Sequence, residues 1–226
     1  MELSFAVHKL ANFSSNPGKV NFEGLVYILR YIWDNHTLVL EYDGDMNDAL
    51  LYELLRQSSI KTENHLMDFY DFSWQDFPYT GRSTGAYIIF YQSGPIYHGI
   101  YVPVPVDQSS AESEYNEACT AGMALAHFRV LIHELLNKDP YIVTWEAPII
   151  VLDGKSLLCV ANNGKDNKHT RHIARRMHLV MSGENFKMHK IDWCEGGLQL
   201  SYISTKNVGE HDLTPIMIYI VVIIDN

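Results

Sequence analysis

Apolar residues in the first 34 positions recur at the spacing of amphipathic helices. The pattern predicts one helix over residues 3–13 and a second over 18–34, separated by the turn-forming stretch SSNPGK. Residues 37–43 (TLVLEYD) then alternate between apolar and polar as a half-buried strand does. Residues 44–64 are polar and weakly patterned, which indicates a linker or a domain boundary.

Aromatic and β-branched runs replace the helical pattern after residue 64. Three runs, HLMDFYDF, TGAYIIFYQSG and PIYHGIYVPV, are separated by Gly, Pro and Ser, so they predict an antiparallel meander. A long helix is predicted from about Ser110 to Asn137, with Ser109 and Glu112 as its capping box. Its predicted inward face consists of Tyr115, Cys119, Gly122, Met123, Ala126 and Val130.

The second half of the chain continues with strands and helices in alternation. The continuous apolar run before Asp153 predicts a strand that is covered on both faces. A short helix (155–163), a basic helical stretch (165–181), a strand (186–193) and a final helix (198–206) follow. This order predicts an α/β fold with a mixed sheet flanked by helices.

Composition and charge narrow the classes of function. The chain has 226 residues, 47% of them hydrophobic, which is enough for one substantial core. Its formal net charge of −10 disfavours non-specific binding to nucleic acid, because such binding depends on Lys and Arg neutralising phosphates. A local basic run is the exception, and it is either a solvated helix face or a phosphate-contacting surface; its members include Lys168, Arg171, Arg175 and Arg176.

The cysteines and the apolar runs indicate where the protein works. Three cysteines without framework spacing favour free thiols in a reducing, intracellular compartment, either cytoplasm or nucleus. The longest apolar run, Ile216 to Ile224, is too short to span a bilayer, so no membrane association is expected.

Three carboxylates lie where burial makes them costly. Asp71 interrupts an apolar strand, Asp153 ends a buried one, and Glu114 lies near the start of the long helix. If these acids meet, their mutual repulsion favours a hard divalent cation between them, Mg²⁺ or Mn²⁺ rather than zinc. Each acid also has an ordinary explanation: a turn cap for Asp71, a favourable helix-dipole position for Glu114, and an Asp-Gly turn for Asp153.

Two other candidate motifs fail on spacing. Gly154-Lys155-Ser156 resembles the end of a phosphate-binding loop, but Ile149 stands where the first glycine of that loop is required. Three histidines between residues 169 and 178, with Cys159, lack the paired Cys-x-x-Cys spacing of a zinc site.

Seven motifs in order carry a family resemblance. FAVHKLANFSSNPGKVNFEGLVYILRYI, YDFSWQD, GRSTGAY, QSSAESEYNEA, IVLDGKS, KHTRHIARRMH and LQLSYISTK resemble the C-terminal part of the polymerase polyprotein of a copia-type LTR retrotransposon. The resemblance runs from about Phe5 to Lys206. It implies a post-palm helical segment at 1–60, a ribonuclease H-like domain at 61–214 with a mixed five-stranded sheet flanked by helices, and an apolar tail at 215–226.

The resemblance also implies a site. The family's four metal-binding carboxylates fall on Asp71, on Glu114 with Glu112 as the alternative, on Asp153, and on a position that Tyr202 occupies here. Asp212 lies too far along the chain to replace the fourth acid unless the last helix is displaced. In this interpretation Asp71 bridges two cations, Mg²⁺ or Mn²⁺, Glu114 and Asp153 hold one of them, and the fourth acid normally anchors the other.

The implied reaction is hydrolysis of the RNA strand of an RNA–DNA hybrid by two cations. A neutral phenol at the fourth position predicts weak or absent activity in Mg²⁺. Three hypotheses stay open: an impaired ribonuclease H, a catalytically inactive module that binds nucleic acid or protein, and a relic of a decayed element. The polymerase portion of the parent polyprotein is an expected partner for the N-terminal helices.

Overall fold

The computed structural model describes residues 3–39, 66–74, 77, 81–91, 94–103, 109–136, 147–154, 174–186, 188–206 and 222–223. For residues 39, 110–111, 174–177, 184 and 222–223 it describes the backbone only.

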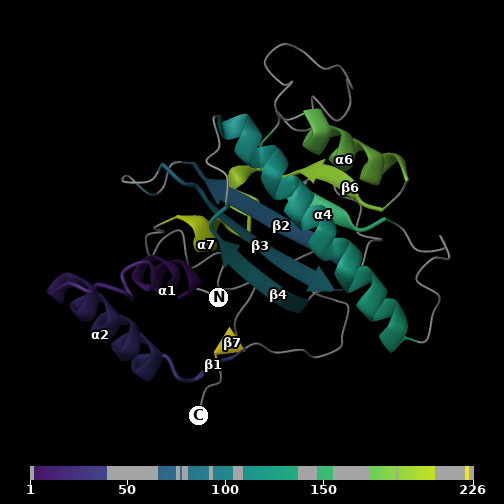
Figure 1. Ribbon diagram of the computed structural model, residues 1–226. Coiled ribbons are helices and arrows are strands. Elements are labelled where there is room, and N and C mark those ends of the chain that lie inside the picture. Colours follow the sequence, from purple (N-terminus) through teal and green to yellow (C-terminus); the bar gives the residue numbers. More distant parts are fainter. Residues whose placement is uncertain are drawn as a thin grey trace.

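A mixed five-stranded sheet lies at the centre of the described chain (Figure 1). Its strands are β2 (Leu66–Ser73), β3 (Thr84–Tyr91), β4 (Gly94–Tyr101), β5 (Ile149–Leu152) and β6 (Lys190–Trp193), arranged in the order β4-β3-β2-β5-β6. The first three form the predicted antiparallel meander, whereas β5 pairs in parallel with both β2 and β6. This is the strand order of a ribonuclease H-like sheet, so the predicted fold class is confirmed.

Local chemistry explains the strand boundaries. All four residues of β5 are buried, as expected for a parallel strand that is covered on both faces. The connection from β2 to β3 turns at Gly81, whose φ of 63° lies in the left-handed region that glycine adopts without a steric penalty. The backbone N–H of Gly81 closes this turn by donating to the carbonyl oxygen of Phe77 over 2.8 Å.

The long helix α4 (Ser110–Leu135) crosses one face of the sheet (Figure 1). It begins as predicted, because the Ser109 hydroxyl accepts a hydrogen bond from the backbone N–H of Glu112 over 3.2 Å. Its predicted inward face is only partly correct. Tyr115 and Cys119 are buried, but Met123 is 61% exposed, and the small residues Ala118 and Ala121 pack toward the core instead.

Two further helices complete the sheet domain. Helix α6 (Ala174–Asn185) packs beside α4 and leads into β6. After the 3₁₀ turn η1 (Gly196–Leu198), the four-residue helix α7 (Tyr202–Thr205) lies against β2 and β3. The predicted final helix is therefore present but much shorter. The predicted helix over 155–163 and the first part of the basic stretch lie outside the described residues.

The two predicted N-terminal helices are confirmed as α1 (Ser4–Ala11) and α2 (Lys19–Asp34). Helix α1 lies against α7 and against the outer strand β4. Contacts there include a 2.9 Å hydrogen bond between Ser4 Oγ and His98 Nε2, and the Lys9 ammonium 4.2 Å from the centre of the Phe77 ring.

A two-residue antiparallel ribbon joins distant parts of the sequence. Strand β1 (Leu38–Val39) follows α2, and β7 (Val222–Ile223) belongs to the apolar tail. Leu38 pairs with Ile223, and Val39 with Val222. The remainder of the predicted strand over 37–43 lies outside the described residues. In the part of the chain that is described, no helix has the length and apolar character needed to cross a bilayer.

Candidate functional site

Asp71 and Asp153 lie side by side at the carboxyl ends of two parallel strands. Met67 pairs with Ile149 and Phe69 with Val151, so continuing this register by two residues aligns Asp71 with Asp153. The charges of both groups act on the thiol of Cys194. Burial raises its pKa to about 12, and the charges of Asp153, Asp192 and Asp71 add to the effect.

Glu114 reaches the same end of the sheet from α4. A Cβ atom added to Gly154 would lie 3.0 Å from the Oε1 atom of Glu114, so this carboxylate rests against the residue that follows Asp153. Tyr70, next to Asp71 on β2, responds to the charge of both Glu114 and Asp153, although burial is the largest cause of its raised pKa. Glu114 therefore lies at the same end of the sheet as Asp153.

Asp71 is buried, with 4% of its surface exposed. Its side-chain partners are the last residue of α7, Thr205, and the residue that follows it, Lys206. The Thr205 hydroxyl donates a short hydrogen bond to Asp71 Oδ2. The Lys206 ammonium lies 3.4 Å from the same oxygen. Burial raises the pKa of the Asp71 carboxyl, while the Lys206 charge and the Thr205 hydrogen bond oppose that rise.

Tyr202 lies in the same cluster, at the first position of α7. The Lys206 ammonium sits 4.2 Å from the centre of the Tyr202 ring, which is cation–π geometry. Tyr202 and Asp71 thus contact the same lysine. The position where the family resemblance expects an acid presents an aromatic ring to that lysine.

Gln199 fixes the segment that carries these groups. Its fully buried side-chain amide donates to the backbone oxygen of Tyr70 over 2.9 Å and to that of Val151 over 3.2 Å. These two carbonyl groups belong to β2 and β5, so one side chain binds α7 to both strands that carry the aspartates. Sequence reasoning missed Gln199, because nothing in a lone glutamine indicates which backbone groups it will reach.

Two buried acids were also missed. Asp68 is fully buried on β2, and Glu117 is buried on α4, one turn after Glu114. Among the described residues, neither oxygen of Asp68 nor Oε1 of Glu117 has a hydrogen-bond partner. Burial raises the pKa of both carboxyls well above its usual range, and the charges of Asp71 and Asp68 add to the effect on Glu117. Glu117 did have a signal, since it follows Glu114 at helical spacing.

The described acids do not fit a two-cation centre as they stand. Within the ranges that the structure describes, no three His, Cys, Asp or Glu side chains are close enough together to hold a metal ion. One carboxylate oxygen of Asp71, Oδ2, is engaged by Thr205 and Lys206. A Mg²⁺ or Mn²⁺ site at Asp71, Glu114 and Asp153 stays a prediction.

The predicted phosphate-contacting run falls largely outside the described chain. Lys168 and Arg171 lie outside the described residues. Arg175 and Arg176 are in the first turn of α6, where the backbone alone is described. Their role in binding nucleic acid stays a prediction.

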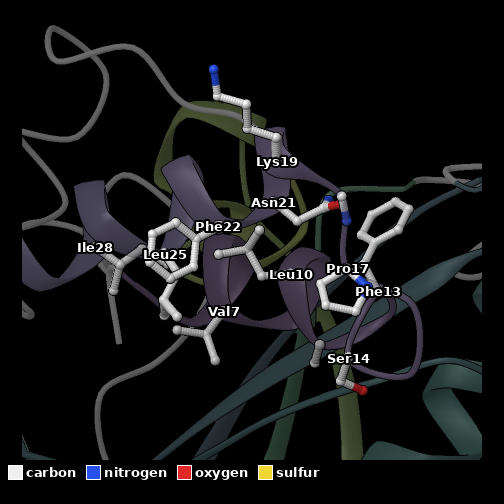
Figure 2. A pocket seen from close by; sticks show the side chains of 12 residues that line it. Val7, Leu10, Phe13, Ser14, Pro17, Lys19, Asn21, Phe22, Leu25 and Ile28 are labelled. Carbon is white, nitrogen blue, oxygen red and sulfur yellow. The ribbon is translucent and has the colours of Figure 1, made fainter.

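A separate apolar groove of about 680 Å³ lies between α1 and α2. Figure 2 shows Val7 and Leu10 of α1 directed toward Phe22 and Leu25 of α2, while Lys19 points away. A smaller cavity of about 200 Å³ lies between α4 and α6, next to the buried His189. Neither cavity is lined by Asp71, Glu114 or Asp153.

Comparisons with known proteins add little to this geometry. No model of a protein family matches the chain, and no curated protein matches its sequence. Among solved structures, the chain is similar to the crystal structure of RNase H1 from the halophilic archaeon Halobacterium salinarum NRC-1, with 12% identity and a TM-score of 0.43. That match covers 60% of this chain and 89% of the other. The fold assignment rests on the strand order of the sheet and not on this similarity.

Proposed function

We propose that this chain is a ribonuclease H-type domain of retroelement origin, whose hydrolysis of the RNA strand of RNA–DNA hybrids is weak or absent in Mg²⁺. The supporting observations are the register that aligns Asp71 with Asp153, the position of Glu114 against Gly154, and the lysine that Tyr202 and Asp71 share. A phenol at the fourth position supplies no carboxylate to a cation.

The rest of the proposal follows from the family resemblance. Residues 1–60 form a connection segment that packs on the polymerase portion of the parent polyprotein, 61–214 form the ribonuclease H-like domain, and 215–226 form an apolar tail. The protein acts inside the cell, in the cytoplasm or nucleus. Lys168, Arg171, Arg175 and Arg176 contact hybrid phosphates, while the A-like hybrid form is recognised by its shape and its 2′-OH groups.

The test is cleavage of an end-labelled RNA–DNA hybrid by the purified chain in Mg²⁺ and in Mn²⁺. We expect the wild type to cut weakly or not at all, and Tyr202→Asp to cut faster by about tenfold or more, because a missing carboxylate is restored. Asp71→Asn in the Tyr202→Asp background is the matched control, and it should abolish the gain. The proposal is wrong if Tyr202→Asp remains folded and silent in both metals.

A second candidate is a catalytically inactive module that binds hybrids. The specific observation in its favour is the ion pair of Asp71 with Lys206, together with the absence of a metal-holding group in the described part of the chain. Fluorescence anisotropy with a labelled hybrid in EDTA separates the two candidates. Metal-independent binding that prefers hybrid over duplex DNA, with a silent Tyr202→Asp variant, would support the module.

A further inference from the structure

Two side chains contact Oδ2 of Asp71, and a third contacts one of those two. Lys206 Nζ lies 3.4 Å from Oδ2, and the Thr205 hydroxyl donates to the same atom. The Tyr202 ring also contacts the ammonium, with 4.2 Å from Nζ to the ring centre. Lys206 therefore contacts both a carboxylate and an aromatic face, each of which attracts a cation.

We propose that the Lys206 ammonium takes the place of a divalent cation at Asp71, and that Tyr202 holds it there. Tyr202 then has two effects: it provides no carboxylate, and it keeps Lys206 in the position of the cation. This inference depends on the proposed function only for the location of the cation position; its consequences concern metal binding and do not require cleavage.

The short helix brings the three groups together. Tyr202 and Lys206 are four residues apart, and the backbone N–H of Lys206 donates to the carbonyl oxygen of Tyr202 over 3.2 Å. The Thr205 hydroxyl lies 3.2 Å from that same carbonyl oxygen. Gln199 binds the turn before α7 to β2 and β5 through two hydrogen bonds, which fixes the position of the backbone that leads to Lys206.

Burial explains why Asp71 takes an internal cation. The Asp71 side chain is 3% exposed, and a charged carboxylate at such a position needs a countercharge. The Lys206 side chain is 34% exposed, so its stem is covered while its charged end reaches inward from the surface. An external cation must displace this tethered ammonium, and its apparent affinity falls by the fraction of molecules in which the oxygen is available.

The inference differs from simple loss of a ligand at position 202. If the missing carboxylate were the whole defect, removing Lys206 would leave metal affinity unchanged. If the lysine occupies the cation position, removing it exposes Asp71 to an external ion while Tyr202 is still present. The two explanations therefore predict opposite results for Lys206→Met.

The experiment is a titration of the full chain with Mn²⁺. Calorimetry measures the affinity, and paramagnetic broadening of amide signals near Asp71 locates the bound ion. We expect the wild type to bind weakly and Lys206→Met to bind about tenfold more tightly or better, as expected for removing a nearby positive charge. Lys206→Arg keeps the charge and should behave as the wild type. Lys190→Met, which removes an exposed lysine of β6, is the matched control.

Further variants locate the gained site and protect the test against misfolding. Asp71→Asn in the Lys206→Met background should abolish the added binding. Tyr202→Leu keeps both charges and removes only the ring, so it should show a smaller gain in Mn²⁺ affinity. Folded Lys206→Met or Tyr202→Leu protein with unchanged affinity overturns the inference, and so does tight Mn²⁺ binding near Asp71 in the wild type.

The outcome is separate from that of the cleavage test. A gain in Mn²⁺ affinity without hybrid cleavage supports the proposal that Lys206 occupies the cation position, while the proposed function fails. Cleavage by Tyr202→Asp without a gain in the Mn²⁺ affinity of Lys206→Met supports the proposed function and contradicts the role given to Lys206.

Discussion

Asp68 and Glu117 are buried acids whose polar atoms the sheet–helix interface leaves largely unpaired among the described residues. Burying a charged carboxylate costs several kcal/mol, so both groups are favoured in the neutral, protonated form in the folded protein. They flank Tyr70 on the face of β2 that α4 covers. The free energy of unfolding should therefore depend on pH through these two buried carboxyls.

Protein stability should fall as pH rises, because the pKa of Glu117 is raised on folding. The contribution of Glu117 to the free energy of unfolding is full below the ordinary pKa of about 4. It decreases above that pH and is lost as the pH passes through the raised pKa. Glu117→Gln should flatten this dependence and increase the free energy of unfolding at pH 8 by about 1 kcal/mol or more. Urea denaturation at several pH values measures the effect.

Glu134→Gln, an exposed change on the same helix, is the control and should leave the pH profile as it is. A Glu117→Gln profile that runs parallel to that of the wild type would show that the buried carboxyl does not titrate on unfolding.

Residue by residue, the sequence predicts which acids meet better than what they contact. The alignment of Asp71 with Asp153 could be predicted, because both follow apolar runs that the pattern predicts as strands of one sheet. The contact of Lys206 with Asp71 could not, because it depends on where a four-residue helix ends and how a flexible side chain turns back. Gln199 was hidden for the same reason.

At the scale of elements, β3 and α4 approach each other closely at Gly85. A Cβ atom there would lie 2.3 Å from Glu117 Oε2 and 2.6 Å from its Cδ, which is closer than real atoms pack. Glycine at this position lets the buried carboxylate rest on the strand backbone. The distance between the helix and the sheet at this point thus depends on two residues that are remote in sequence.

Gly85→Ala should therefore destabilise the fold by about 1–3 kcal/mol through overpacking. In a Glu117→Ala background the same change should cost much less, since the colliding carboxylate is gone. Gly197→Ala is the control, because no atom lies within 4 Å of its Cβ position. Thermal unfolding of the four Gly85/Glu117 combinations measures the coupling, and an equal cost in both backgrounds would contradict the close approach.

The predicted elements succeed where one pattern dominates and fail where a partner sets the limit. The apolar run of β5 could be read directly, because a strand covered on both faces has no polar side. The predicted strand over 186–193 shortens to Lys190–Trp193, since β5 offers only four residues to pair with. Met123 was placed inward for its hydrophobicity, but small alanines line the face of α4 that meets the sheet.

For the whole molecule, the ribbon of β1 and β7 joins the helical segment to the apolar tail. Val39 pairs with Val222 across it, and paired residues of an antiparallel ribbon have Cα atoms about 4.5–5.5 Å apart. This pairing connects two segments of the proposed domain division that the sequence alone gave no reason to associate. Long-range contacts between short strands leave no periodic signal of their own.

The ribbon predicts a disulfide between Val39→Cys and Val222→Cys under mild oxidation, in a chain that also carries Cys159→Ser. The cross-link would close a loop across most of the chain, visible as faster migration on a non-reducing gel. Val39→Cys with Ile223→Cys is the matched control, because in this register Val39 pairs with Val222 while Ile223 pairs with Leu38. Equal cross-linking of both pairs, or of neither, would contradict the register.

The cluster of Tyr202 and Lys206 also has a genetic consequence. Tyrosine codons become aspartate codons by one substitution at the first base, so a single point mutation exchanges the aromatic face for a carboxylate. Tyr202 is only half-buried, and the exchange leaves Gln199, Thr205 and the strands beneath them in place. A lineage that carries this chain is therefore one mutation away from the four acids that the family resemblance implies.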